Sequence, residues 1–375
     1  MNWIERSLDE LGEVNRGRSR HRPRDAAHLY GGRHPFVQTG DVKRADLYLT
    51  EYSQTYSEAG LAQSKLWKAG TLCITIAANI ADTAILGIDA CFPDSVIGFI
   101  ADKKKSDARF IKYMFDARLK HRYRTFSQGV AQDNLSQEKL LSIKFLVPEK
   151  VADQQLIADI LTSYDALIAN NDRRIIFLEK YSRLLFDEWF VWLRYPSNEH
   201  NKILDGLPIG WELAKIGQVC PLSYGKALPE PKRVHGEFPV YGSSGEVGTH
   251  NTKLVSSPGI VVGRKGNVGS VFWVDHDFWP IDTAYFVTPA SVSLFCYHLL
   301  SSQSFENSDA AVPGLNRDYA HAKEIKWPPA ELRDLYEQAV KPVFAQRGKL
   351  IAMNSKLRAA RDLLLPRLMD GRIEV

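Results

Sequence analysis

The stretch VADQQLIADILTSYDALIANNDRRIIFLEKYSRLLFDEWFVW, from Val151 to Trp192, contains neither glycine nor proline, and the rest of the chain is interpreted from it. Within it, residues that are apolar except for Asn171 and Ser182 recur at alternating spacings of four and three. They are Ile157, Leu161, Tyr164, Ile168, Asn171, Ile175, Leu178, Ser182, Leu185 and Trp189. This seven-residue repeat is typical of a helix that lies along another helix. About 40 helical residues at ~1.5 Å each make a rod of roughly 60 Å, which needs a partner of similar length.

A second segment of the same kind, from Glu331 to Arg367, predicts that partner. Its four-three stripe consists of Val343, Gln346, Leu350, Met353, Leu357, Ala360 and Leu364. Pro342 should kink or split its first part, because proline lacks the N–H that an interior helical position donates. Either the two helices pack separately on the nearest domain, or they pair as one intramolecular coiled coil. The length of both stripes favours the coiled coil.

The composition is that of an ordinary soluble globular protein, and its length of 375 residues predicts two or more domains. No apolar run is long enough to span a membrane, and the segment 1–17 lacks the apolar core of a signal peptide. The cysteines form no CxxC pair, which argues against a zinc site or a disulfide framework and favours a cytoplasmic location. They are Cys73, Cys91, Cys220 and Cys296.

An internal repeat divides the chain into two similar halves. Residues near the start of the first half recur 208 positions later. The pairs are Trp3 and Trp211, Leu8 and Ile216, Leu11 and Val219, Gly17 and Gly225, and Arg18 and Lys226. The block PFVQTGD at 35–41 parallels FPVYGSSG at 238–245, and KAGTLCIT at 68–75 parallels SPGIVVGR at 257–264. Each half ends with a proline boundary and then a long helix, which predicts one structural unit used twice.

The predicted fold class is therefore α+β. Two similar β-rich domains, related by an approximate two-fold axis, are separated by an antiparallel two-helix coiled coil, because the last helix must run back along the first. The predicted boundaries are 1–148 and 196–329 for the domains, with spacer helices over 149–195 and 330–375. Short helices are expected from Arg109 to Arg124 and from Val292 to Gln303.

The common catalytic motifs are missing from the sequence: there is no Walker loop, HExxH, CxxC or GxSxG. One enzymatic alternative remains open. Pro93-Asp94 followed by Asp102 and Lys104 has the residue types of a metal-dependent nuclease, in which two carboxylates hold Mg²⁺ and a lysine polarises a phosphate. The spacing is short, and no supporting acidic residue is nearby.

Basic and polar residues make nucleic-acid binding the favoured function. Five arginines fall within residues 16–24, and Lys103, Lys104 and Lys105 are consecutive; both runs can hold phosphates or simply form a solvated basic surface. The phosphate candidates are Arg16, Arg18, Arg20 and Lys226. The candidates for contacts with base edges are Thr39, Asp41, Asn79, Tyr241, Ser243, Ser244, Arg264, Lys265 and Asn267. Tyr241 could instead be a core residue.

The arrangement resembles the specificity (S) subunit of Type I restriction–modification enzymes. The resemblance rests on the duplicated segment with a tryptophan, a leucine and a Gly-Arg or Gly-Lys pair, on PFVQTGD and GTLCIT, and on GVAQDNLSQEKLLSIKFLVP at 129–148. In the second half it rests on FPVYGSSGEVG, on GIVVGRKGNVGSVFWVDHDFWPIDTAYF and on LLLPRLMDGRI at 363–373. The order and duplication of these blocks, together with the paired long helices, are more specific than any single block.

The resemblance implies a non-catalytic subunit whose two domains each recognise one half of a split, asymmetric sequence in double-stranded DNA. It also implies that the helices act as a spacer and as the docking surface for two methyltransferase subunits. Those subunits bind S-adenosylmethionine and methylate adenine N6, a motor-nuclease subunit joins for cleavage, and this chain itself holds no cofactor or metal. A protein-interaction scaffold that never contacts nucleic acid is the remaining alternative.

Overall fold

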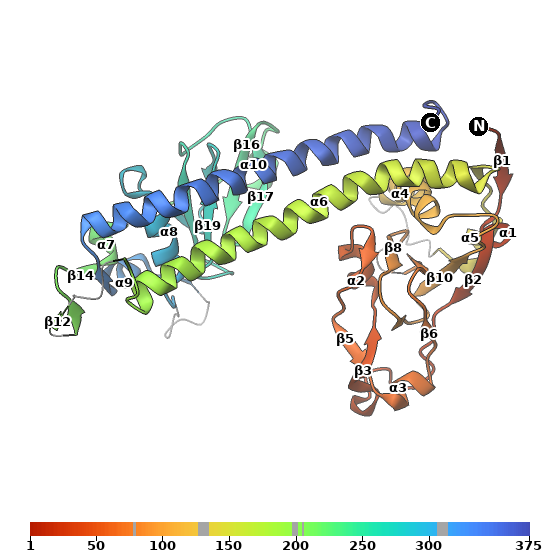
Figure 1. Ribbon diagram of the computed structural model, residues 1–375, viewed down its shortest axis with the longest axis horizontal. Coiled ribbons are helices and arrows are strands. Elements are labelled where there is room, and N and C mark those ends of the chain that lie inside the picture. The colour runs from red at the N-terminus through yellow and green to blue at the C-terminus, as the bar shows by residue number, and fades with distance from the viewer. Residues whose placement is uncertain (78–79, 127–134, 197–201, 205, 306–313) are drawn as a thin grey trace. The chain divides into compact units, whose positions relative to one another are not determined.

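The computed structural model describes residues 1–77, 80–126, 135–196, 202–204, 206–305 and 314–375, and for 119–126 it describes the backbone alone. The chain forms a mixed α/β fold that divides into two compact units (Figure 1). Unit 1 consists of Met1–Asn171 and Met353–Val375, and unit 2 of Asp172–Ala352. Each unit is described by itself below.

Two long helices supply residues to both units. Helix α6 covers Val151–Phe186 and continues as a π-helical turn over Asp187–Val191, and α10 covers Ala330–Met369. The helices predicted over Val151–Trp192 and Glu331–Arg367 are thereby confirmed to within a few residues.

The expected break at Pro342 is wrong, because α10 runs through this residue without interruption. Pro342 and Gln338, whose carbonyl loses its helical donor, both lie on the exposed side of the helix, where water can satisfy that oxygen. Val340 and Phe344 on either side are buried in the core of unit 2 and hold the helix in place.

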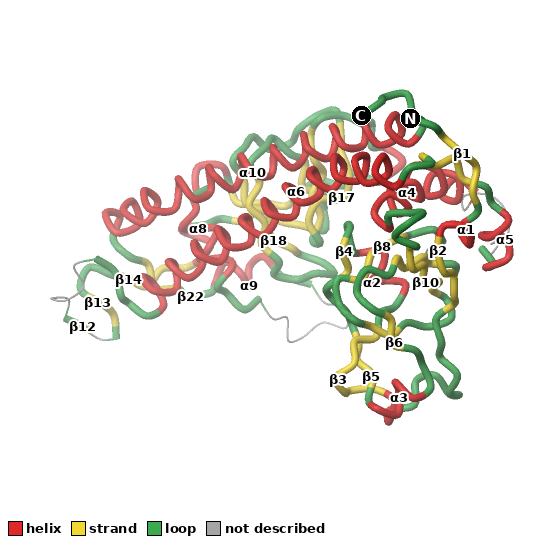
Figure 2. The backbone as a smooth tube through the Cα atoms, turned by 45° about the vertical axis from the view of Figure 1, so that its right-hand side comes forward, coloured by secondary structure: helices red, strands yellow, loops and turns green. Residues whose placement is uncertain are grey.

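Unit 1 has two main sheets, with strand orders β2-β10-β7-β8-β4 and β5-β3-β9-β6, and a separate pair β1-β11. Its strands are β1 (Trp3–Arg6), β2 (Gly12–Arg16), β3 (Tyr30–Phe36), β4 (Tyr48–Leu49), β5 (Gln54–Tyr56), β6 (Leu66–Trp67), β7 (Leu72–Thr75), β8 (Thr83–Leu86), β9 (Ala90–Cys91), β10 (Val96–Ala101) and β11 (Phe145–Pro148). Its shorter helices are α1 (Leu8–Leu11), η1 (Ala27–Leu29), α2 (Thr39–Arg44), α3 (Glu58–Ala62), α4 (Ala108–Phe126) and α5 (Gln137–Ser142). Figure 2 shows α3 beside the paired strands β3 and β5.

Unit 2 repeats this topology, with the sheets β15-β21-β18-β19 and β17-β16-β20 and the pairs β14-β22 and β12-β13. Its strands are β12 (Ile203–Leu204), β13 (Leu207–Pro208), β14 (Glu212–Lys215), β15 (Leu222–Tyr224), β16 (Phe238–Gly242), β17 (Gly245–His250), β18 (Gly259–Gly263), β19 (Val271–Val274), β20 (Trp279–Pro280), β21 (Ala284–Val287) and β22 (Glu324–Trp327). Its shorter helices are α7 (Ile216–Val219), η4 (Glu230–Lys232), η5 (Pro289–Ser291), α8 (Leu294–Ser301) and α9 (Arg317–Ala322).

The strands correspond one to one over most of the two units. The antiparallel order β2-β10-β7-β8 matches β15-β21-β18-β19, and the parallel pair β3-β9 matches β16-β20. Helices α5 and α9 begin at equivalent N-caps, Ser136 and Asn316. The two short helices expected in the sequence are α4 and α8. Register therefore assigns an equivalent in the other unit to many individual residues.

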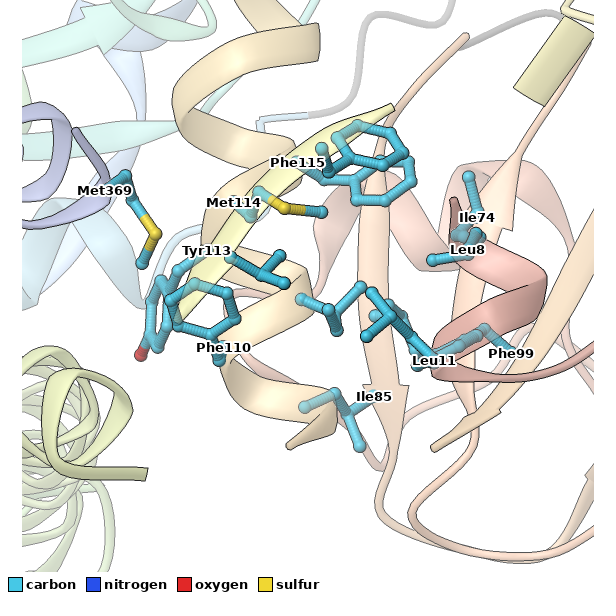
Figure 3. Packing of buried hydrophobic residues seen from close by; sticks show 14 of the residues in the cluster. Leu8, Leu11, Ile74, Ile85, Phe99, Phe110, Tyr113, Met114, Phe115 and Met369 are labelled. Carbon is cyan, nitrogen blue, oxygen red and sulfur yellow. The ribbon is translucent and has the colours of Figure 1, made fainter. Parts of the chain in front are cut away.

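The core of unit 1 lies between the first sheet and helices α1, α4, α6 and α10. Leu8, Leu11, Ile74 and Phe99 meet Phe110 on α4 in this core (Figure 3). Met369 from the end of α10 joins the same cluster, as do Ile157 and Leu161 from α6. The apolar side chains Ile157 and Leu161 of α6 therefore pack in the core of unit 1.

The core of unit 2 is strongly aromatic. Phe186, Phe190, Phe295 and Tyr336 bring their rings within 5.1–6.3 Å of one another, except for the closer pair Phe190–Phe295 at 4.8 Å. The rings come from the end of α6, from α8 and from the start of α10, so the core fixes these helices together. The buried Cys220 and Cys296 belong to the same cluster, and Cys73 and Cys91 are buried in unit 1.

Within each unit α6 and α10 make side-chain contacts with each other. In unit 1 the Asn171 amide donates to Asn354 Oδ1 at 2.8 Å, and Arg361 Nη1 donates to Asp165 Oδ1 at 2.5 Å. In these contacts a higher number on α6 goes with a lower number on α10, so the segments run antiparallel. In unit 2 Arg347 Nε donates to Glu179 Oε1 at 2.6 Å.

All members of the predicted stripe of α6 are buried or partly buried. On α10, Leu350 is buried, and Leu357 and Leu364 are partly buried, as expected. The prediction that Met353 faces inward is wrong, because Met353 is 52 % exposed while the neighbouring Asn354 is 1 % exposed. The inward position between two leucines is therefore 354, one residue further along the helix. Because Asn354 is polar, the spacing of apolar residues does not predict that it faces inward.

Candidate nucleic-acid interface

A corner built from glycine and a basic residue occurs once in each unit. In unit 1 the Gly17 N–H donates to the Val96 carbonyl at 2.9 Å, and the Arg18 N–H donates to the Phe92 carbonyl at 3.1 Å. The first bond belongs to the β2-β10 side, and the second reaches the residue after β9 in the other sheet. The chain therefore crosses between the two sheets at this corner, and the Arg18 side chain is exposed there.

Unit 2 repeats the corner with the same hydrogen bonds. The Gly225 N–H donates to the Ala284 carbonyl at 3.1 Å, and the Lys226 N–H donates to the Pro280 carbonyl at 2.9 Å. A Cβ at Gly225 would lie 2.1 Å from the Ile281 carbonyl oxygen, so no larger residue fits. The repeated glycine is required by backbone approach, and the exposed cation that follows it is presented at the same point of both units.

The arginine run of residues 16–24 divides into structural and exposed members. Arg24 forms an ion pair of 2.8 Å with Asp94, and Arg16 donates from Nε to the Asp94 carbonyl at 3.0 Å. In the described part of the chain the exposed guanidinium groups of Arg18 and Arg20 make no hydrogen bond or ion pair. These two side chains, with the remaining donors of Arg16, are available to anions.

The nuclease alternative does not fit this geometry. Asp94 precedes β10 and Asp102 follows it, so the six residues of the strand separate the backbones of these two residues by about 20 Å. Asp94 is bound by Arg24, and the Asp102 carboxylate accepts from the Lys104 N–H and pairs with Lys105, contacts that lower its pKa. Among the residues that the structure describes, no group of three potential metal ligands comes together.

Of the candidates in the β16–β17 hairpin, two are corrected. Ser243 is 8 % exposed, and its carbonyl accepts from Ser270 Oγ at 2.5 Å, so its side chain is not presented to a partner. Tyr241 packs its ring against Phe272 and Phe278, at 6.4 and 5.9 Å, and burial raises its pKa. The core interpretation of Tyr241 is the one that the structure supports. Ser244 is exposed.

In unit 1 the corresponding turn begins α2. Thr39 is its first residue and is partly exposed. Asp41 is buried and accepts hydrogen bonds from the Gln38 N–H and from Arg44, so it caps the helix instead of facing a ligand. Asn79 lies outside the described residues.

The loop after β18 holds the remaining candidates. Lys265 and Asn267 are exposed, and Arg264 is partly exposed. The Arg264 guanidinium carbon lies 5.0 Å from the centre of the Tyr224 ring and 5.7 Å from that of Tyr285. Burial, followed by the neighbouring Tyr224, raises the pKa of Tyr285.

Sequence reasoning missed two members of this group. Arg317 at the start of α9 also lies over the Tyr224 ring, at 4.8 Å. Tyr224 could have been suspected from its place just before the Gly225-Lys226 pair, but nothing in the sequence connects Arg317 to it. The contact between α9 and β15 brings these residues together.

None of the helices in the described ranges has both the length and the apolar character needed to cross a bilayer.

Comparison with known proteins agrees with this architecture. The curated relative "Type I restriction enzyme MjaIX specificity subunit" from Methanocaldococcus jannaschii is 22 % identical over 414 residues, which cover 100 % of this chain and 94 % of that protein. The crystal structure of a Type I restriction–modification system S subunit from M. genitalium superposes with a TM-score of 0.60 at 15 % identity. It covers 98 % of this chain and 96 % of its own, so the two share a fold.

A family model gives the assignment. The model described as Type I restriction modification DNA specificity domain matches residues 1–180 and again 208–332, so both halves of the repeat are recognised. The chain therefore belongs to the family of Type I restriction–modification specificity subunits, whose function is the recognition of DNA sequence.

Proposed function

We propose that this chain is the non-catalytic DNA-recognition subunit of a Type I restriction–modification complex and directs adenine-N6 methylation by partner subunits. The observation that carries the proposal is the pair of topologically equivalent units with different residues at equivalent surface positions. Two related folds with unlike surfaces are suited to recognise two unlike DNA half-sites. The expected target is therefore bipartite and asymmetric.

The proposed domains are residues 1–148 and 196–329, each a target-recognition domain. The segments 149–195 and 330–375 are spacer helices that pair as an antiparallel coiled coil. Two contacts support the pairing: Asn171 with Asn354 in unit 1, and Glu179 with Arg347 in unit 2. Stiff helices can fix the gap between half-sites, as dimer spacing does for other DNA-binding proteins, whereas a flexible linker cannot.

The spacer helices also provide the proposed docking surface for two methyltransferase subunits, which carry S-adenosylmethionine. Many large apolar side chains are exposed on these two helices. Exposed apolar surface of this kind is typical of a protein–protein interface. The exposed side chains are Leu156, Leu167, Ile176, Phe177, Tyr181, Leu184, Leu335, Ile351, Met353 and Leu363. A motor-nuclease subunit would join this assembly for cleavage.

For DNA contacts we assign phosphate binding to the exposed cations at and near the two corners, which are Arg16, Arg18, Arg20 and Lys226. Base contacts are assigned to Thr39, Ser244, Arg264, Lys265 and Asn267, and also to Asn79, which lies outside the described residues. Phosphate contacts position a protein on the duplex, while contacts in the grooves select the sequence.

The central experiment is to co-express the chain with its cognate methyltransferase subunits and to map methylated adenines in the host genome. A split motif with two different half-sites and a constant gap is expected. Methylation without a sequence preference, or of an unsplit motif, would refute the function. A scaffold that never touches DNA would leave the methylation pattern unchanged when this chain is omitted.

The spacer role is tested by lengthening both helices together. Seven residues inserted after Asn171 and seven after Asn354 keep the seven-residue repeat in phase and add about 10.5 Å, or roughly three base pairs. The gap in the methylated motif should grow by that amount while both half-sites stay the same. If the gap does not change, the helices do not set the distance between the half-sites.

The phosphate assignment is tested by Arg18→Ala and Lys226→Ala in the assembled methyltransferase. Each change should weaken binding to all duplexes alike and reduce the slope of log K against log salt by about 0.9. Arg24→Ala is the matched control, because Arg24 already pairs with Asp94. A slope that is the same in all four proteins would contradict the assignment.

A further inference from the structure

One group in unit 2 combines an exposed aromatic ring with two arginines. The guanidinium carbons of Arg264 and Arg317 lie 5.0 and 4.8 Å from the centre of the Tyr224 ring, and Tyr224 is 48 % exposed. We call these three residues the Arg-Tyr-Arg cluster. It lies at the end of β15, next to the corner formed by Gly225 and Lys226.

Arg264 is held in place by both its backbone and its side chain. Its N–H donates to the Thr283 carbonyl at 2.9 Å, and its carbonyl accepts from the Leu315 N–H at 2.8 Å. Nη1 donates to the Asp282 carbonyl at 3.1 Å, and the guanidinium lies over the rings of Tyr224 and Tyr285. A guanidinium held over aromatic rings and by a backbone acceptor loses part of its freedom, so its N–H donors are oriented in advance.

Arg317 reaches the same ring from the first position of α9, whose N-cap is Asn316. Within the described residues its buried Nε makes no hydrogen bond, and the nearest carboxylate oxygen is that of the exposed Asp318, at 3.7 Å. The cluster therefore places two guanidinium groups at one aromatic ring, and the Arg317 Nε has no hydrogen-bond partner among the described residues.

Among the described residues of unit 1, strand register places no such cluster at the equivalent positions. In unit 2 Tyr224 pairs with Tyr285. The equivalent pair in unit 1 is Arg16 with Ile97, so Arg16 occupies the position of Tyr224. The Ile76 N–H donates to the Ser95 carbonyl just as the Arg264 N–H donates to the Thr283 carbonyl.

The position of Arg317 after its N-cap is taken in unit 1 by Gln137, whose amide donates to the Val14 carbonyl at 3.2 Å. The equivalents of Tyr224, Arg264 and Arg317 are therefore Arg16, Ile76 and Gln137. Within the ranges that the structure describes, the cluster therefore occurs in unit 2 and not in unit 1.

This difference separates two kinds of contact. Arg18 and Lys226 occupy the same corner of both units, as expected for residues that hold the phosphate backbone present at any sequence. The Arg-Tyr-Arg cluster lies beside that corner but is specific to one unit, as expected for residues that select one half-site. Fixed, planar arginines are suited to donate two hydrogen bonds to guanine O6 and N7.

We propose that the Arg-Tyr-Arg cluster of Tyr224, Arg264 and Arg317 recognises guanine in the half-site bound by the second domain. The inference rests on the proposed function. It adds two residues, Tyr224 and Arg317, to the interface, and it specifies the base and the half-site.

The test uses the full chain co-expressed with its methyltransferase subunits and genome-wide mapping of methylated adenine. Arg264→Lys and Arg317→Lys keep the charge but remove the planar donor pair, and Tyr224→Leu removes the stacking surface. Each should lower the preference for guanine at a position of one half-site by roughly tenfold or more, leaving the other half-site unchanged. Having three separate variants guards against one that fails to fold, which thermal unfolding would reveal.

Arg333→Lys is the matched control, because Arg333 also lies over an aromatic ring of unit 2. Its guanidinium carbon is 4.3 Å from the centre of the Trp327 ring. It should leave the motif unchanged. Loss of methylation to the same degree at all sites, with a shallower salt dependence, would show a phosphate contact and overturn the inference. An unaltered motif in all three folded variants would also overturn it. A wild-type chain that produces no split motif would instead refute the proposed function.

Discussion

Asn171 and Asn354 are joined by a side-chain hydrogen bond of 2.8 Å between α6 and α10, and both are almost completely buried. Asn354 also donates to the Ile168 carbonyl at 3.3 Å. On α10 it lies seven residues after Arg347 and seven before Arg361, which both bind acidic residues of α6. One inward position of every heptad on this part of α10 is therefore polar and is matched across the helix pair.

The asparagine pair should behave as a unit. Asn354→Leu leaves the buried Asn171 amide without this acceptor and should lower the free energy of unfolding by about 1–3 kcal/mol. Replacing both by leucine should be close to neutral or stabilising, because no buried polar group remains unmatched. Urea unfolding of the wild type, both single variants and the double variant measures the coupling. Additive effects would show that the two amides do not depend on each other.

Arg361 should be more sensitive than other arginines near the C-terminus. It binds the buried carboxylate of Asp165, which also accepts from Tyr113. Arg361→Ala leaves that carboxylate without its cation and should cost about 3–5 kcal/mol of stability. Arg372→Ala is the control, because the Arg372–Asp370 pair is exposed and should contribute less than about 1 kcal/mol. Equal losses in the two variants would contradict the buried role.

The corner glycines should not tolerate a side chain. In Gly17→Ala the new Cβ would lie 2.3 Å from the Pro93 carbonyl oxygen, a contact that requires backbone movement. A loss of about 1–3 kcal/mol is expected, as for other overpacked sites. Gly40→Ala is the matched control, because its Cβ would meet nothing within 4 Å. Thermal unfolding compares them, and a stable Gly17→Ala protein would disprove the tight crossing.

His298 should make the stability of unit 2 depend on pH. Burial, with a smaller contribution from Arg183, lowers its pKa from 6.5 to about 3, and its Nε2 has no hydrogen-bond partner within the described residues. The unfolded chain therefore takes up the proton first as the pH falls. The contribution of the neutral His298 to the free energy of unfolding is complete above pH 6.5 and is lost progressively as the pH falls toward 3. Between pH 7 and 5 the loss should be about 2 kcal/mol.

In His298→Gln this part of the pH dependence should disappear, whereas in His276→Gln, which changes an exposed histidine, it should remain. Urea unfolding at pH 7 and 5 measures the difference. The same slope in His298→Gln and in the wild type would mean that the imidazole is protonated in the folded protein.

The long helices, their antiparallel partnership within each unit and the repeated strand pattern could be predicted because they depend on local spacing. Apolar residues at heptad intervals specify a helix with one buried side wherever it packs. The recurrence of Gly17-Arg18 as Gly225-Lys226 likewise marks equivalent positions without knowledge of the sheets. Family membership follows from the same order of blocks.

The chemical role of individual side chains was decided by the tertiary structure alone. Asn354 faces inward instead of Met353, because a matched polar partner on α6 outweighs the preference for an apolar residue. Ser243 and Tyr241 differ little in sequence context from the exposed Ser244, yet hairpin geometry buries Ser243 and partly buries Tyr241. Arg317 meets Tyr224 only because α9 and β15 are adjacent in space, and the packing of a helix on a strand 93 positions away is not encoded by local spacing.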